Sequence, residues 1–203
     1  MHRLEAASTA LRQALEVFTP DRWPQEWAGA QGLLGGVLWS QGSERGGADG
    51  IRLLTEAEEA LRRTLEVYTR EQQPFQWAME HGLLGAVLTW QGRWSQGAES
   101  ARLLTEAVRG QRQALEVLPR EQWGGMQIIL GESLVAQGAR QAGEEGARLL
   151  AEAVRGYRQA IEVYTPEHAP RLWGDAQGAL GDALVEQGMR RSGEEGQRLF
   201  VDA

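Results

Sequence analysis

The sequence predicts an all-α fold in which antiparallel pairs of helices repeat along the chain. The first observation is a frame in which a Trp is followed by Leu-Gly, then by a second Leu and by Gln-Gly. Residues at i, i+4, i+7 and i+11 share one face of an α-helix, so the frame fits a helix. Self-similarity at a fixed period is typical of stacked helical arrays. Four copies of the frame begin at Trp27, Trp77, Trp123 and Trp173.

A second apolar frame alternates with the first and predicts the second helix of each pair. It covers residues 3–18, 51–68, 101–118 and 147–164. In one copy its landmarks are Leu54, Ala57, Leu61 and Leu65. Spacings of three and four residues place these side chains on one amphipathic stripe. Arg62 and Glu66, on the opposite side, are spaced for an exposed ion pair.

The recurrent glycines predict two different local structures. Glycine inside a helix costs roughly 1 kcal/mol relative to alanine, so the glycine of each Leu-Gly indicates a neighbouring helix too close for a Cβ. The glycine of each Gln-Gly fits a C-terminal helix cap. A polar loop is then expected from there to the second helix, whose first turn carries an acidic residue that favours the helix dipole.

The order of the frames predicts one repeat domain over residues 1–203, with about nine helices. A first helix covers residues 1–19, and the last helix of the chain is truncated. The four repeats that follow the first helix cover residues 20–69, 70–118, 119–165 and 166–203. Pro24, Pro74 and Pro170 precede the tryptophans at a spacing suited to a first helical turn. Four residues are missing before Trp123, which predicts a shortened helix or a tighter corner there.

Composition argues against several classes of protein. The chain has no Cys, which excludes disulfides and thiolate metal sites. No apolar run approaches the ~20 residues of a membrane span, and no signal sequence is evident at the N-terminus. The net charge of −7 disfavours a nucleic-acid binder, which needs a basic face. We therefore expect no membrane or nucleic-acid partner.

The usual signatures of catalysis are missing. The histidines, at positions 2, 81 and 168, have no metal-ligand spacing. The glycines of residues 32–36 lie inside a helical frame, and Ser133 has no nucleophile elbow. Glu144 and Glu145 fit a solvated helix start better than a catalytic carboxylate pair. We therefore expect a protein that is not an enzyme, with no catalytic residue, metal or cofactor.

The two frames together resemble the tetratricopeptide repeat. The first helix carries Leu-Gly-x-x-Leu-x-x-x-Gly and the second Ala-x-x-x-Leu-x-x-Ala, and residues 65–78 are similar to the junction of bacterial arrays of this kind. The repeat is about 50 residues long instead of the common ~34. The resemblance implies a right-handed α-solenoid with the first helices on its concave side. It also implies a non-enzymatic module that binds proteins or peptides, within a cytoplasmic bacterial signalling or regulatory protein.

Two surfaces are candidates for binding a partner. On the family's concave side we expect Trp39, Met79, Trp90, Glu132, Asp175, Asp182 and Glu186, which favour a peptide with basic and apolar residues. The four tryptophans that begin the frames are instead expected to be buried between repeats. The alternative is self-assembly through open helical ends, because residues 198–203 match only the start, residues 2–7, of the second frame.

Overall fold

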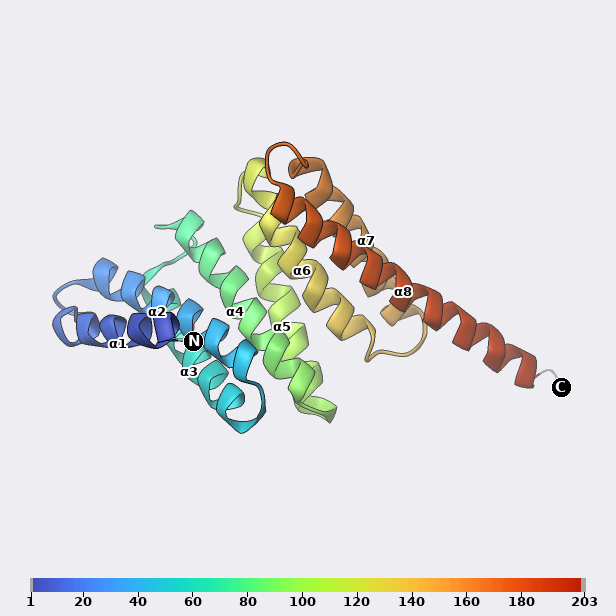
Figure 1. The fold of residues 1–203 in the computed structure, drawn as a ribbon, viewed down its shortest axis with the longest axis horizontal. Helices are drawn as coiled ribbons and strands as arrows, with labels where there is room; N and C mark the ends of the chain where they lie inside the picture. The colour runs from blue at the N-terminus through green and yellow to red at the C-terminus, as the bar shows by residue number, and fades with distance from the viewer. Residues whose placement is uncertain (1, 202–203) are drawn as a thin grey trace. The chain divides into compact units, whose positions relative to one another are not determined.

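A computed structural model describes the backbone of residues 2–201 and the side chains of residues 3–190 (Figure 1). Helices make up 85% of the chain, and the described part contains no strand, so the all-α helical-repeat prediction is confirmed. The elements are α1 (His2–Val17), α2 (Pro24–Arg45), α3 (Gly47–Val67), α4 (Pro74–Trp94), α5 (Gly97–Leu115), the 3-10 turn η1 (Arg120–Gln122), α6 (Trp123–Gly138), α7 (Gly143–Val163) and α8 (Pro170–Val201).

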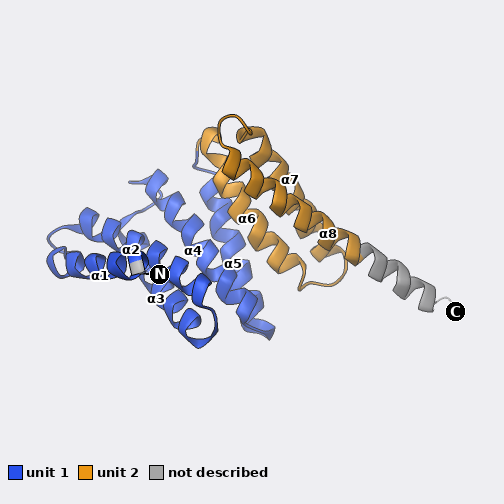
Figure 2. Ribbon diagram, in the orientation of Figure 1, with its two compact units in different colours: residues 1–118 blue, residues 119–203 orange. Residues whose placement is uncertain are grey.

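The chain divides into two compact units, residues 1–118 and residues 119–203 (Figure 2). In unit 1, helices α1 to α5 each pack on the next helix in sequence, and α2 also contacts α4. In unit 2, α6 packs on α7, α7 on α8, and α6 on α8. The division falls where the sequence predicts the end of the second repeat.

The core of each hairpin is formed by the apolar faces predicted for its first and second helices. In unit 1, Leu38 of α2 is 1% exposed, and Leu54 and Leu61 of α3 are fully buried. The hydroxyl of Thr64 donates to the carbonyl of Ala28, 3.3 Å away, and so joins α3 to the first turns of α2. The apolar stripe of the second helix therefore packs on the first helix of its own repeat.

The Leu-Gly glycines allow the close approach that the sequence predicts. A Cβ added to Gly35 would lie 2.7 Å from Leu61 Cγ, and one added to Gly85 would lie 2.6 Å from Gln111 Cδ. In unit 2, a Cβ on Gly131 would lie 2.5 Å from Tyr157 Cε1. In each hairpin, a large side chain of the second helix thus occupies the space left by a missing Cβ.

The prediction that the Gln-Gly glycines cap their helices is wrong. Gly42 and Gly92 lie inside α2 and α4, and Gly138 is the last residue of α6. Each packs on the second helix: a Cβ on Gly42 would lie 3.0 Å from Leu54 Cγ. These glycines stay helical because the returning helix passes close to them, as it does at the Leu-Gly glycines.

The long polar loop expected between the paired helices is also wrong. The corner between α2 and α3 is the single residue Gly46, and the other corners are residues 95–96 and 139–142. The chain reverses at glycines with positive φ, which only glycine adopts readily. These are Gly46, Gly47, Gly97 and Gly143. The extra length of the repeat therefore lies in longer helices.

The starts of the helices follow the sequence. Pro24, Pro74 and Pro170 begin α2, α4 and α8, and acidic residues such as Asp49 and Glu99 lie in the first turn of the second helices. Helix α6 begins at Trp123 and has 16 residues, against 22 in α2 and 21 in α4. The four-residue gap in the sequence thus shortens a helix, as predicted.

The end of the fourth repeat differs from the prediction. Helix α8 runs without a break from Pro170 to Val201, so no corner separates a last short helix over residues 198–201, and residues 202–203 lie outside the described part. The described chain has eight α-helices and one 3-10 turn, where about nine helices were expected. No described helix returns along α8, so the contact that accompanies each other corner is missing there.

Substituting Gly85 tests the close approach inside the hairpins. Gly85→Leu should lower the free energy of unfolding by about 1–3 kcal/mol, because the new side chain would displace Gln111. Gly178→Leu in α8 is the control, since no described atom lies within 4 Å of a Cβ added there. That variant should be neutral or slightly more stable, because leucine favours a helix more than glycine. Urea denaturation measures both, and equal stabilities for Gly85→Leu and the parent chain would contradict the packing.

Candidate functional site

The three candidate partner-binding residues of unit 1 lie at its core or beside it. Trp39 is half-buried against the core cluster, and its indole Nε1 is buried without a described hydrogen-bond partner. Trp90 is also half-buried on that cluster, 5.6 Å from Trp94 between ring centroids, with Arg93 over its ring. Met79 is 47% exposed. Neither tryptophan is thus a freely exposed anchor.

The four acidic candidates belong to unit 2. Asp175 and Asp182 are exposed on α8, and Glu186 is half-buried on the same helix. Glu132 of α6 is half-buried. The structure thus gathers three of the four carboxylates on α8, which makes this helix the acidic element among the candidates.

The tryptophans that begin the frames are half-buried, and the prediction that they are buried between repeats is wrong. They lie in the first turns of their helices. Trp77 packs edge-on against His81, with ring centroids 4.4 Å apart, and Arg70 lies over the same ring. Arg120 covers Trp123 in the same way. Cation–π contacts with arginine thus take the place of full burial.

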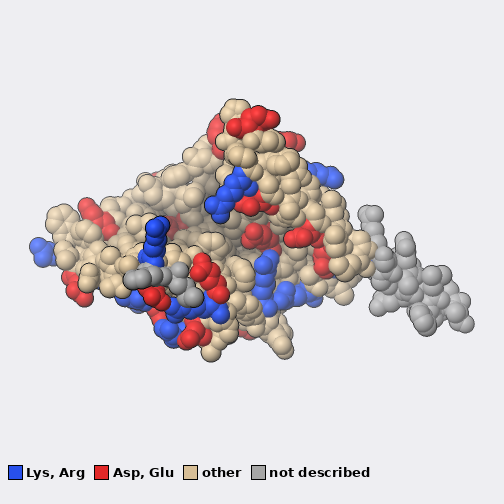
Figure 3. Space-filling model, in the orientation of Figure 1, with Lys and Arg blue, Asp and Glu red and all other residues tan. Residues whose placement is uncertain are grey.

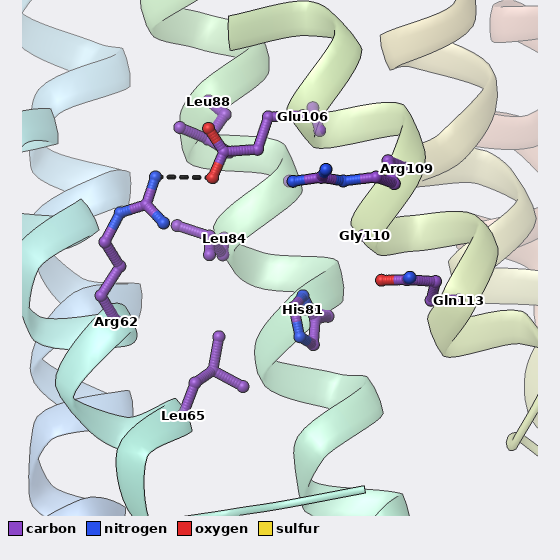
Figure 4. A pocket seen from close by; sticks show the side chains of 11 residues that line it. Arg62, Leu65, His81, Leu84, Leu88, Glu106, Arg109, Gly110 and Gln113 are labelled. Atoms are coloured by element: carbon purple, nitrogen blue, oxygen red, sulfur yellow. Dashed lines mark hydrogen bonds and ion pairs between the residues drawn. The ribbon is translucent and has the colours of Figure 1, made fainter.

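Unit 1 contains a small cavity of about 190 Å³ between α3, α4 and α5 (Figure 4). Leu65, Leu84 and Leu88 form its apolar wall, and His81, Arg109 and Gln113 contribute polar groups. Arg62 reaches across to Glu106, with 2.7 Å between nitrogen and oxygen. The cavity is too small for a drug-sized ligand, since ligand pockets usually exceed about 300 Å³.

The charges around this cavity compensate one another. Glu106 accepts from Arg62 with one carboxylate oxygen and from Arg102, 3.1 Å away, with the other. Burial lowers the pKa of His81, and the nearby Arg109 and Arg62 lower it further, whereas Glu106 acts in the opposite direction. Because arginines of α3 and α5 bind both carboxylate oxygens of Glu106, these charged groups form a structural network between the two helices.

Ion pairs also run along the second helices. Arg12 of α1 binds Glu56 of α3 at 2.6 Å, and Arg62 of α3 binds Glu106 of α5 in the equivalent register. Arg62 pairs with Glu58 as well, at 2.9 Å, instead of with Glu66 as the spacing predicted. On the face shown in Figure 3, acidic and basic side chains are interspersed over the described surface, and no broad basic patch is visible.

Glu80 is an isolated buried carboxyl in unit 1. Its side chain lies over Gly32 of α2, and its Oε2 has no described hydrogen-bond partner. Burial raises the pKa of the Glu80 carboxyl to about 7. The signal was present in the sequence, because the equivalent positions in the other first helices hold Ala30, Met126 and Ala176. An acidic residue in an apolar frame indicates either a site or a strained core position.

Gln111 is a second polar residue at an apolar position. It is fully buried in α5, and neither its Nε2 nor its Oε1 has a described hydrogen-bond partner. Leu61 and Tyr157 hold the equivalent positions in the other hairpins, against Gly35 and Gly131. Gln111 therefore lies where a large side chain fills the space above a glycine, but its amide makes no described hydrogen bond there.

Helix α8 exposes a surface that is covered in every other hairpin. Leu184 is 44% exposed, whereas its equivalents in α2, α4 and α6 are each 1% exposed. No described atom lies within 4 Å of a Cβ added to Gly174, Gly181 or Gly188. We call this surface, formed by Gly174, Gly181, Leu184 and Gly188, the open face of α8. It is the strongest candidate for a binding site in the described chain.

The rest of α8 is fixed to its own unit. Ala176 and Ala183 are fully buried. The guanidinium of Arg190 donates to the carbonyls of Gly138, Gln141 and Gly143, with the shortest distance 2.6 Å. The open face is therefore presented by a helix held on α6, α7 and their connecting corner, so a partner would meet a surface already in place.

Comparison of the chain with protein-family models, with curated proteins and with solved structures found no match. Among the described residues, no group of His, Asp and Glu is arranged to hold a metal ion. No described helix is both long and apolar enough to span a membrane.

Glu80 predicts a pH dependence of stability. Below pH 4.5 the carboxyl is protonated in both states, but between pH 4.5 and 7 the unfolded chain ionises first, so the parent chain should lose stability as pH rises. The loss should reach at most about 3 kcal/mol. Glu80→Gln should therefore be more stable than the parent at pH 8, and this advantage should shrink towards pH 4.5. Denaturation at several pH values measures it, with the exposed Glu59→Gln as control; a constant difference would contradict the burial of this carboxyl.

Gln111→Leu should stabilise the chain by about 1–3 kcal/mol, the usual cost of a buried polar group without a partner. Leu61 shows that a leucine fits this position against a glycine. Gln76→Leu, at an exposed helical site, is the control and should change stability by less than about 0.5 kcal/mol. Thermal and urea unfolding compare the variants. A destabilised Gln111→Leu would mean that the amide has a partner that the described contacts do not include.

Proposed function

We propose that this chain is a non-enzymatic helical-repeat module that binds another protein by accepting one of its helices on the open face of α8. The observation that carries the proposal is the contrast between Leu184, 44% exposed, and Leu38, Leu88 and Leu134, each 1% exposed. In those three hairpins an amphipathic helix covers the leucine. The same surface on α8 is thus already shaped for a helix.

The chemistry of the open face favours an apolar helix of defined pattern. Glycines leave recesses along α8. In the other hairpins, large side chains seven residues apart fill such recesses, as Leu54 does at Gly42 and Leu61 at Gly35. The exposed carboxylates of Asp175 and Asp182 on the same helix favour a partner with basic residues beside its apolar stripe. This agrees with the basic and apolar partner expected from the sequence, but places it on α8 instead of on the half-buried tryptophans.

The resemblance to tetratricopeptide repeats supports the same class of function. Members of that family mostly bind peptides or partner proteins, and bacterial arrays of this kind accompany signalling or regulatory domains. We therefore propose a scaffold role in such a protein. The cavity in unit 1 offers no comparable surface, because it measures only about 190 Å³ and its Arg62 and Glu106 are paired with each other.

A peptide with the sequence of residues 143–164, which includes all of α7, tests this proposal. In the structure α7 covers the equivalent face of α6, so the labelled peptide should bind the full chain, and fluorescence anisotropy should detect it. Leu184→Glu should weaken binding at least tenfold, because it places a charge in the apolar contact. Leu172→Glu is the matched control on α8: Leu172 is 42% exposed, and its equivalents in the other repeats are polar, so binding should not change. Equal binding of a scrambled peptide, or no binding, would contradict the proposal.

A further inference from the structure

Helix α1 carries the half of the hairpin interface that α8 lacks. Its sequence follows the second frame, and in the described structure it packs on α2, the first helix of the next repeat. In α3, the residues facing the paired helix are nearly inaccessible: Leu54, Ala57 and Thr64 are fully buried, and Ala60 is 4% exposed. The equivalent residues of α1 are half-buried or exposed: they are Leu4, Ala7, Ala10 and Ala14.

The exposed residues of α1 lie on the side that the other hairpins use. Ala10 is equivalent to Gly110 and Gly156. A Cβ on Gly110 would lie 3.0 Å from His81 Nδ1 of the paired α4, and one on Gly156 would lie 2.8 Å from Gln127 Oε1 of the paired α6. We call the surface formed by Leu4, Ala7, Ala10 and Ala14 the open face of α1. It corresponds to the surface that packs on the paired helix in the other hairpins, and no described helix packs on it.

We infer that the helix accepted by α8 is α1 of a second copy of this chain. The inference rests on the proposed function and names its partner. In the register of α2 and α3, Leu54 packs on Gly42 and Leu61 on Gly35. The same register places Leu4 of one copy on Gly188 of the other, and Leu11 on Gly181. The joined pair would be a fourth hairpin, assembled from two molecules.

The two open faces are complementary in shape and not alike. The open face of α8 offers glycine recesses, whereas the open face of α1 offers leucine and alanine side chains that match such recesses. Two α8 helices would place recess against recess and leave voids, which cost packing energy. A contact between unlike ends is therefore favoured over a symmetric one.

Such a contact has a definite consequence for assembly. Because each copy has one α1 and one α8, the contact is heterologous and leaves a free end on each side of a pair. Copies then add in a row or close into a ring, whereas a symmetric contact stops at a dimer. The competing occupant of the open face is the chain itself, since residues 193–203 match the start of the α7 frame, residues 143–153.

Sedimentation velocity on the full chain, over a wide concentration range, tests the inference. The parent chain should grow from monomer to species larger than a dimer. Leu184→Glu on α8 and Ala10→Arg on α1 should each raise the concentration needed for assembly at least tenfold. Leu172→Glu should leave assembly unchanged. Each substituted side chain is at least partly exposed, so all variants should remain helical, and circular dichroism checks this.

Mixing the two defective variants gives the sharpest result. Leu184→Glu keeps an intact α1, and Ala10→Arg keeps an intact α8, so an equimolar mixture should form a one-to-one dimer that does not grow. Assembly by Ala10→Arg alone would show a symmetric contact through α8 and overturn the inference. A parent chain that stays monomeric at every concentration would also overturn it, and would favour a fold-back of residues 193–203.

The same measurements separate this inference from the proposed function. If the parent chain stays monomeric but the peptide of residues 143–164 still binds at Leu184, then α8 accepts a helix from a different protein. If neither the peptide nor a second copy binds, both proposals fail. If the copies assemble and the peptide competes with that assembly, both stand.

Discussion

The structure depends on one repeated contact, in which a large side chain of the second helix fills the space above a glycine of the first. Leu61 lies on Gly35, Gln111 on Gly85 and Tyr157 on Gly131. The missing Cβ lets two helices approach closely over several turns, which compensates for the poor helix propensity of glycine. The Gln-Gly glycines extend this contact to the corner, so each pair forms one tightly packed hairpin. This contact holds the repeat together.

The same contact explains which apolar surfaces stay open in the described structure. A repeat protein buries each helix against its neighbours, so the outermost elements are left with uncovered apolar residues. Unit 2 ends in α8 with Leu184 exposed, and unit 1 begins with α1, whose stripe is open on one side. Both helices keep several apolar residues of an internal repeat, although α1 has Arg3 where α3 has Leu53.

Departures from the repeat pattern mark a different kind of position. Glu80 and Gln111 place polar groups where the other copies have apolar residues, and neither side chain satisfies all its hydrogen-bonding atoms among the described residues. A buried group without a partner costs stability and, for a carboxyl, raises the pKa. Both lie in the α4–α5 hairpin of unit 1, next to the small cavity or close to it in sequence.

The sequence by itself determined the helical class, the alternation of two helix types and the contacts at the Leu-Gly glycines, because periodicity and residue size are local properties. For the four residues missing before Trp123 it left open a shortened helix or a tighter corner, and the structure has the shortened α6. Only the tertiary structure decided that Gly42 lies inside a helix, that Trp77 is half-covered by Arg70 and His81, and that Arg62 pairs with Glu106. These outcomes depend on which helix passes nearby, and spacing within one helix carries no such information. The exposure of Leu184 was also decided by the tertiary structure, since leucines at the equivalent repeat positions are buried or exposed according to whether a neighbouring helix covers them.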